Sequence, residues 1–249
     1  MSRFVTAVVF GLLAGVIVAQ QPGEDKNGPI GPQTENTLKT SDGGEISYLL
    51  SVPESEAGQK LPLMLFLHGR GESDGPLSLV AKWGPPMKVA RGEALPYLLV
   101  SPQCPRDDFW SSETQQKRLV ELLDEIVQTH PVDQDRVYLT GLSMGGFGSW
   151  QLACDHPDRF AAVVPICGRG KPELAEKLVD VPIWVFHGDQ DKSVPFSHSV
   201  DMVNAIRSAG GDKVRFTSLE SVGHNSWSAA YATPELYQWI SRHRRNDNN

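Results

Sequence analysis

The segment Val137-Tyr-Leu-Thr-Gly-Leu-Ser-Met-Gly-Gly146 joins a short apolar run to a glycine-rich turn. Within it, Gly141, Ser143 and Gly145 form a G-x-S-x-G pattern, which is typical of a sharp turn between a strand and a helix. Such a turn holds the serine in a strained backbone conformation, and a Cβ at either flanking glycine would collide with neighbouring backbone. Gly146 lets the following helix lie close to the sheet. The segment therefore predicts an exposed, nucleophilic serine hydroxyl at position 143.

On both sides of this turn, short apolar runs alternate with amphipathic segments. This alternation is typical of a mostly parallel sheet covered by helices on both faces. The predicted strands are Ile46–Val52, Leu63–Leu67, Tyr97–Val100, Val137–Thr140, Ala162–Ile166, Ile183–Phe186 and Val214–Leu219. The predicted helices run from Ser112 to His130, from Ser197 to Ala209, and onward from Thr233-Pro234. Because no segment repeats, we expect a single α/β domain over residues 37–243.

A serine hydroxyl is a weak nucleophile, so it needs a base that removes its proton. His224 lies in Ser221-Val-Gly-His-Asn-Ser-Trp227, a glycine-containing loop after the last predicted strand. An imidazole on such a loop can reach back to a hydroxyl at the turn around residue 143. The other histidines that follow the turn lie at the end of a strand, at a helix end, on a helix face or in the tail. The sequence therefore favours His224 as the base.

The base in turn needs an acid to orient it, and two aspartates follow the strand that ends at Phe186. The loop reads His187-Gly-Asp-Gln-Asp-Lys-Ser-Val-Pro195. Asp191 is the favoured acid, and Asp189 is expected to stabilise the turn through a side-chain hydrogen bond. His187 is expected to shape the loop through hydrogen bonds of its own.

The oxyanion that forms on an attacked carbonyl needs hydrogen-bond donors. The segment Leu65-Phe-Leu-His-Gly-Arg-Gly-Glu72 follows an early buried strand and can direct a backbone N–H toward the serine. The predicted donors are the backbone N–H groups of Arg70 and of Met144, the residue after the nucleophile.

Composition excludes several other classes of protein. The chain has 249 residues, a formal net charge of −7 and no concentrated basic stripe, so nucleic acid is not an expected partner. Its three cysteines show no metal-ligand spacing, and we expect neither a metal nor a cofactor. No feature of the sequence indicates an oligomeric state.

Both ends of the chain differ in composition from the predicted domain. Residues 1–19 combine Arg3 with a short apolar run and read as a secretory signal peptide, with an uncleaved anchor as the alternative. Residues 20–36 are rich in glycine, proline and charge and are predicted to form a flexible leader. Residues 244–249 are predicted to be a disordered tail. We therefore expect a secreted or periplasmic protein without stable membrane insertion once the signal is removed.

The chain resembles a known group of α/β-hydrolases, the carboxylesterase and predicted-peptidase group related to phospholipase/carboxylesterase and polyhydroxybutyrate-depolymerase-like esterases. The matching segments are LPLMLFLHGRGES, LLVSPQCP, RVYLTGLSMGGFGSW, HPDRFAAVVPICG, VPIWVFHGDQDKSVP and GHNSW, in that order. The resemblance implies the α/β-hydrolase fold and a triad of Ser143, Asp191 and His224. It also implies a strand order that keeps Cys104 too far from Cys167 for a disulfide.

The number of residues between two of the predicted strands indicates how open the site is to substrate. Only about sixteen residues separate the strands ending at Ile166 and starting at Ile183, which leaves no room for a large cap domain. An open site suits short-chain or aryl esters, with acetyl or feruloyl groups on plant polysaccharide as candidates. Trp83, Trp110 and Trp227 lie in connections where an aromatic ring could contact substrate. A prolyl-oligopeptidase-like serine peptidase and an acyltransferase that uses the same triad are the alternatives.

Overall fold

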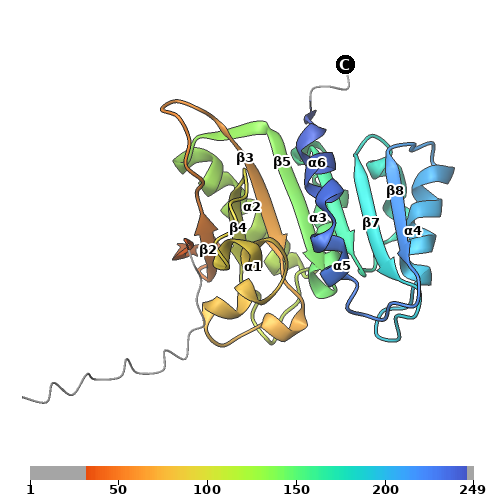
Figure 1. Cartoon of the computed structure of the whole chain (residues 1–249). Helices are drawn as coiled ribbons and strands as arrows, with labels where there is room; N and C mark the ends of the chain where they lie inside the picture. Colours follow the sequence, from red (N-terminus) through yellow and green to blue (C-terminus); the bar gives the residue numbers. More distant parts are fainter. Residues whose placement is uncertain (1–31, 246–249) are drawn as a thin grey trace, which may run out of the picture.

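The computed structural model describes residues 32–245, which form an eight-stranded sheet in the order β1-β2-β4-β3-β5-β6-β7-β8 (Figure 1). The strands are β1 (Thr34–Lys39), β2 (Glu45–Ser51), β3 (Leu61–Leu67), β4 (Leu98–Pro102), β5 (Val132–Leu142), β6 (Ala162–Ile166), β7 (Ile183–Gly188) and β8 (Val214–Leu219). The pairings from β4 to β8 are parallel, whereas β2 pairs antiparallel with both β1 and β4. Every strand that the sequence predicts is present, and so is the mostly parallel α/β architecture.

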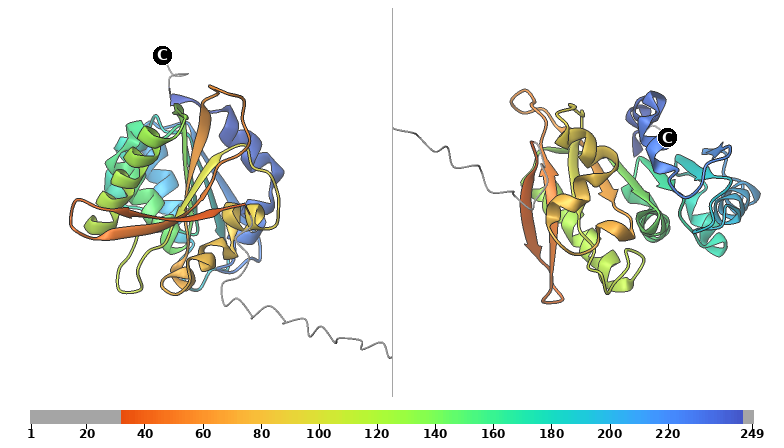
Figure 2. Two further views of the ribbon diagram at one scale, coloured as in Figure 1. Left: turned by 90° about the vertical axis from the view of Figure 1, so that its left-hand side faces the viewer. Right: turned by 60° about the horizontal axis from the view of Figure 1, so that its bottom comes forward.

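Helices cover both faces of the sheet, as predicted. One face packs against α2 (Glu113–Thr129), α3 (Met144–Asp155) and α4 (Ser197–Ser208). The other packs against α1 (Gly84–Ala90), α5 (Trp227–Ala232) and α6 (Pro234–Arg242). Figures 1 and 2 show α1 and α6 on the side of the sheet opposite α2. The two cores follow from strand alternation: in β5, Leu139 points into the first and Tyr138 into the second.

Two of the predicted helices show why their ends were predictable. The Ser112 side chain accepts a hydrogen bond from the Gln115 N–H at 3.2 Å and so caps the start of α2. Proline at the first position of α6 needs no hydrogen-bond partner, and Leu236 and Ile240 anchor that helix on the sheet. The predicted bounds differ from the observed ones by one residue or so, as helix ends commonly do.

The boundaries of the predicted leader and tail need correction. Thr34, Glu35 and Asn36 belong to β1, an edge strand that the sequence analysis did not predict. At the other end, Arg244 contacts the Asp133 carboxylate at 3.2 Å, and Arg245 contacts Asp135. Residues 34–36 are therefore not part of a flexible leader, and residues 244–245 are not part of a disordered tail. The predicted signal peptide lies outside the described residues.

The connections confirm that no large cap domain is present. The link between β6 and β7 contains only the short 3-10 helix η4 (Pro172–Leu178). The longer link after β3 holds the 3-10 helices η1 (Arg70–Glu72) and η2 (Leu77–Lys82) followed by α1. In residues 32–245, no helix has the length and apolar character needed to cross a bilayer.

The three cysteines are buried free thiols. Cys104 follows β4 and Cys167 follows β6, and the sheet order places β3 and β5 between those two strands. The expected separation of this pair is therefore confirmed.

Candidate active site

The turn between β5 and α3 has the strained geometry that the G-x-S-x-G pattern predicts. Ser143 has φ +52° and ψ −115°, and its N–H donates to the Ile166 carbonyl at 2.9 Å. A Cβ on Gly145 would lie 1.9 Å from the Leu67 carbonyl oxygen, and one on Gly141 would lie 2.4 Å from the Gly145 carbonyl oxygen. Only glycine fits at these two positions, because the obstructing atoms are backbone.

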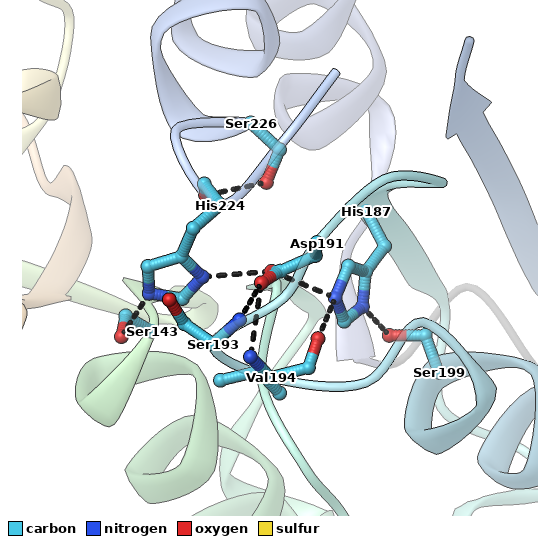
Figure 3. A network of polar contacts seen from close by, with 8 residues as sticks. All are labelled: Ser143, His187, Asp191, Ser193, Val194, Ser199, His224 and Ser226. Atoms are coloured by element: carbon cyan, nitrogen blue, oxygen red, sulfur yellow. Dashed lines mark hydrogen bonds and ion pairs between the residues drawn. The ribbon is translucent and has the colours of Figure 1, made fainter. Parts of the chain in front are cut away.

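The structure brings Ser143, His224 and Asp191 together at the carboxyl ends of β5, β7 and β8 (Figure 3). The Ser143 Oγ lies 2.8 Å from His224 Nε2, and His224 Nδ1 lies 2.7 Å from Asp191 Oδ2. Residues that are separated by up to 81 positions thus form one continuous chain of hydrogen bonds. Since Nδ1 faces a carboxylate, it carries the proton, and Nε2 is free to accept one from the serine.

The carboxylate of Asp191 is held from two sides. Its Oδ1 accepts the N–H groups of Ser193 and Val194 at 2.8 and 2.9 Å. Its Oδ2 accepts from His224 and also lies 3.1 Å from His187 Nε2. Burial alone would raise the pKa of Asp191, but the hydrogen bonds from His224, Val194 and Ser193 hold it below its usual value. The carboxylate is therefore ionised and fixed in orientation.

His187 helps to hold the Asp191 carboxylate in place. Its ring is fully buried, and Nε2 faces two acceptors, Asp191 Oδ2 and the Val194 carbonyl at 3.0 Å. Nε2 must therefore carry the hydrogen, which leaves Nδ1 to accept from the Ser199 hydroxyl at 2.7 Å. Burial lowers the pKa of His187, which favours this neutral form. The prediction that His187 shapes the loop is in line with these contacts.

Asp189, the aspartate that was not favoured as the triad acid, makes a side-chain hydrogen bond, as predicted, and this bond joins two loops. Asp189 Oδ1 accepts the Ser221 N–H at 2.8 Å, and Ser221 has a positive φ of 59°. The Gln190 N–H donates to the Val222 carbonyl at 3.0 Å. These bonds tie the loop that carries Asp191 to the loop that carries His224.

The two predicted oxyanion donors lie at the starts of helices. Met144 is the first residue of α3 and Arg70 the first of η1, so neither N–H is used in an intrahelical hydrogen bond. The side chains of these two residues are in contact, with Arg70 Nη1 3.9 Å from Met144 Sδ. The Arg70 side chain therefore lies beside the serine turn, and the role of the two backbone N–H groups as oxyanion donors stays a prediction.

The segment that carries Arg70 is held by residues that the sequence analysis did not single out. The His68 ring is buried; its Nε2 accepts the Cys104 N–H at 2.9 Å, and its Nδ1–H donates to the Gly69 carbonyl at 2.6 Å. Gln103 donates its side-chain N–H to the Glu72 carbonyl at 3.0 Å. The position of His68 directly after a buried apolar strand was the available signal for this role.

The prediction that Trp110 contacts substrate is wrong. Trp110 is fully buried, and its Nε1–H donates to the His68 carbonyl at 3.1 Å. Its ring also packs edge-on against the His68 ring, with centroids 5.2 Å apart. Trp110 therefore packs against the segment from His68 to Glu72, which carries the predicted donor Arg70 and is called the oxyanion loop below, and its ring is closed to substrate.

The other two predicted tryptophans lie beside the base. Trp227 packs edge-on against the His224 ring at a centroid distance of 5.3 Å, and Trp83 contacts Trp227 at 6.0 Å. Both side chains are half-buried. Trp227 limits the positions that the imidazole can adopt, and a contact with substrate stays a prediction for both tryptophans.

Three neighbouring side chains in the triad region carry atoms of the kinds that bind metal ions. The ligand atoms of Cys167, Asp191 and His224 lie within 4.8 Å of one another among the described residues. However, burial raises the pKa of the Cys167 thiol to about 12, so the sulfur keeps its proton. The His224–Asp191 hydrogen bond already uses the other two groups. These residues fit a proton-transfer chain better than a metal ion.

Acid is expected to destabilise the fold through His68. Burial lowers the pKa of His68 to about 4, whereas an unfolded histidine titrates near 6.5. Between these values the unfolded chain binds a proton that the folded chain does not, so the free energy of unfolding falls as pH falls. We expect a loss of about 3 kcal/mol between pH 7 and pH 4 from this group.

Urea unfolding of the wild type and His68→Asn at pH 7 and at pH 4.5 measures this contribution. The asparagine keeps a donor for the Gly69 carbonyl but does not titrate, so the variant should lose less stability on acidification. Equal losses in the two proteins would show that His68 is not the titrating group.

Comparisons with known proteins agree with this fold. The phospholipase/carboxylesterase family matches residues 101–238. "Probable feruloyl esterase C" of Aspergillus terreus is 26% identical over 82% of this chain and 74% of its own length. NocK of Nocardia uniformis subsp. tsuyamanensis, an esterase by name, is 31% identical over 54% of this chain and 41% of its own length.

Solved structures show the same relationship. A thermostable esterase superposes with a TM-score of 0.78 and 32% identity, covering 87% of this chain and 64% of its own. A ferulic acid esterase shares the fold, with a TM-score of 0.61 and 21% identity. The match covers 84% of this chain and 98% of the ferulic acid esterase. The chain spans less than two thirds of NocK and of the thermostable esterase. This chain belongs to the phospholipase/carboxylesterase family of α/β-hydrolases.

Proposed function

We propose that the chain is an exported serine carboxylesterase that hydrolyses short-chain or aryl esters through an acyl-enzyme on Ser143. The observation that carries the proposal is the unbroken chain of hydrogen bonds from Ser143 Oγ through His224 to Asp191 Oδ2. Asp191 lies in a buried, fully hydrogen-bonded environment, whereas the hydroxyl of Ser143 is part-exposed at the protein surface. This is the arrangement that nucleophilic catalysis needs.

The reaction has two halves. His224 Nε2 takes the proton of Ser143 as the oxygen attacks the ester carbonyl, and the N–H groups of Arg70 and Met144 stabilise the resulting oxyanion. The tetrahedral species collapses as the imidazolium donates its proton to the leaving alcohol. Water then attacks the acyl-enzyme with His224 again acting as base, and the acid is released. Each oxyanion donor typically contributes about 3–4 kcal/mol of transition-state stabilisation.

The short link between β6 and β7 supports an open site. With only η4 in that link, no cap domain encloses a long acyl chain. Two relatives have names that mention an ester substrate: feruloyl esterase C of Aspergillus terreus and the acetylxylan esterase/xylanase XynS20E of Neocallimastix patriciarum. These names support acetyl or feruloyl groups on plant polysaccharide as substrates. Trp227, which contacts His224, and Trp83, which contacts Trp227, are proposed contacts for the alcohol part.

The test is a panel of nitrophenyl esters from acetate to palmitate, measured beside methyl ferulate and acetylated xylan. We expect turnover to be greatest for acetate and butyrate and to fall sharply for long chains. Faster cleavage of a matched amide than of its ester would indicate a peptidase. Transfer to an added alcohol in excess of hydrolysis would indicate an acyltransferase.

Export is proposed from residues 1–19 and is tested separately. Expression of the full chain in a host with a general secretory pathway should release a protein whose mature N-terminus lies near residue 20. Retention of the full-length chain in the membrane fraction would instead support an uncleaved anchor.

A further inference from the structure

One exposed aromatic side chain lies beside the oxyanion loop. Phe109 is 52% exposed, and the only other large apolar side chain that exposed among residues 32–245 is Val52. The guanidinium of Arg70 lies over the Phe109 ring, 4.4 Å from its centroid. Single exposed apolar residues are common on proteins, so exposure alone does not indicate a role. The surroundings of this ring distinguish it.

The loop that carries Phe109 is rigidly held. Arg70 donates to the carbonyl oxygens of Arg106 and Asp108 from its two terminal nitrogens. The Asp108 carboxylate accepts the Phe109 N–H at 2.7 Å on one oxygen and the Gln115 side chain at 2.9 Å on the other. The next residue along the chain, Trp110, is buried under the oxyanion loop. The exposed ring is therefore preorganised, with little side-chain freedom left to lose on binding.

The position of the Phe109 ring indicates which part of a bound ester it would contact. The leaving oxygen must lie near His224, because that imidazole protonates it. Phe109 lies instead against the side chain of Arg70, which also contacts the side chain of Met144, so the ring is on the side of the two residues whose N–H groups are the predicted oxyanion donors. Trp227 and Trp83 occupy the side of His224. By this geometry, Phe109 lies toward the acyl part of a bound ester and the two tryptophans toward the alcohol.

We propose that Phe109, backed by Arg70, forms a binding site for an aromatic ring in the acyl group, which makes aryl esters such as hydroxycinnamates the preferred substrate class. This inference rests on the proposed function. A cation on one face of the ring draws electron density away from the other face. The open face then favours stacking with an electron-rich ring that bears hydroxyl and methoxy groups.

The test compares two methyl esters that differ only in the ring. Methyl ferulate and methyl crotonate are both conjugated esters of methanol, and only the former carries an aromatic ring. For Phe109→Ala we expect kcat/KM for methyl ferulate to fall about tenfold, mainly through KM, with less than a twofold change for methyl crotonate. Phe109→Tyr should retain the preference, because it keeps the ring.

Val52→Ala is the matched control. Val52 is 48% exposed and follows β2, whose last residue pairs with Leu99 near the start of β4, away from the carboxyl ends of the parallel strands. The Val52→Ala substitution should leave kcat/KM for methyl ferulate and for methyl crotonate unchanged.

Two results would overturn the proposal: an unchanged ratio of kcat/KM for the two methyl esters in Phe109→Ala, or a loss confined to phenyl acetate relative to methyl acetate. The last result would place the ring on the alcohol side. A wild type that cleaves neither methyl ester nor nitrophenyl acetate would refute the proposed function itself, so the two failures are distinguishable.

Discussion

Ser143→Ala is expected to lower kcat/KM for p-nitrophenyl acetate by about 10⁴-fold or more while leaving the melting temperature within a few degrees of the wild type. Removal of the nucleophile leaves only binding and oxyanion stabilisation, which account for a small part of the rate of a serine hydrolase. The structural cost is one hydrogen bond to a half-buried imidazole, about 1 kcal/mol. The strained backbone at position 143 is common to both proteins.

Ser149→Ala is the matched control for this experiment. Ser149 lies on the same helix, and its hydroxyl donates to the Gly145 carbonyl at 2.8 Å, yet the side chain is fully buried. This variant should lose some stability and keep its activity. A fluorophosphonate probe should label the wild type and Ser149→Ala but not Ser143→Ala. Near-wild-type turnover in Ser143→Ala would exclude the acyl-enzyme mechanism.

Asp191→Asn should reduce kcat by about 10³–10⁴-fold. The carboxylate accepts four N–H groups, from His224, His187, Ser193 and Val194. A carboxamide has one oxygen and one NH₂ group, so at least two of these donors would face another donor. If the amide nitrogen faces His224, the proton moves to the wrong nitrogen of the imidazole, and Nε2 can no longer accept from the serine.

Asp189→Asn tests whether the effect is specific to the acid of the triad. Its side chain makes a single hydrogen bond to the Ser221 N–H, which an asparagine oxygen can also accept. We expect less than a threefold change in kcat and a small change in thermal stability. If Asp189→Asn were the more damaging of the two substitutions, the assignment of the acid would have to be reversed.

The parts of the fold and of the candidate site that were predictable are those set by local patterns. The turn at Ser143 was predictable because the flanking glycines are required by backbone atoms that would obstruct a side chain. Asp191 and His224 were predictable as partners because loops after parallel strands meet at one edge of the sheet, whatever their separation in sequence. The buried strands were predictable from their continuous apolar runs.

Features that depend on contacts between distant segments were not predictable. β1 has the sequence TENTLK, which lacks an apolar run, and it forms because β2 offers an edge with which to pair. Arg244 and Arg245 are ordered by acids more than 100 positions away. Phe109 and Trp110 are adjacent aromatics, and nothing in their order indicates which one is buried. The conformation of one loop decides it.

The contacts of that loop limit how this protein can vary in evolution. The segment from Gln103 to Trp110 braces the backbone that carries one proposed oxyanion donor, and it also presents Phe109 to solvent. An insertion or deletion that reshaped the acyl pocket here would also displace His68 and slow the chemistry for every ester. A point replacement at position 109 leaves the hydrogen bonds to His68 and Glu72 in place, because none of them uses the Phe109 side chain. We therefore expect natural variation in acyl preference among relatives to accumulate at this position, with the length of the loop kept constant.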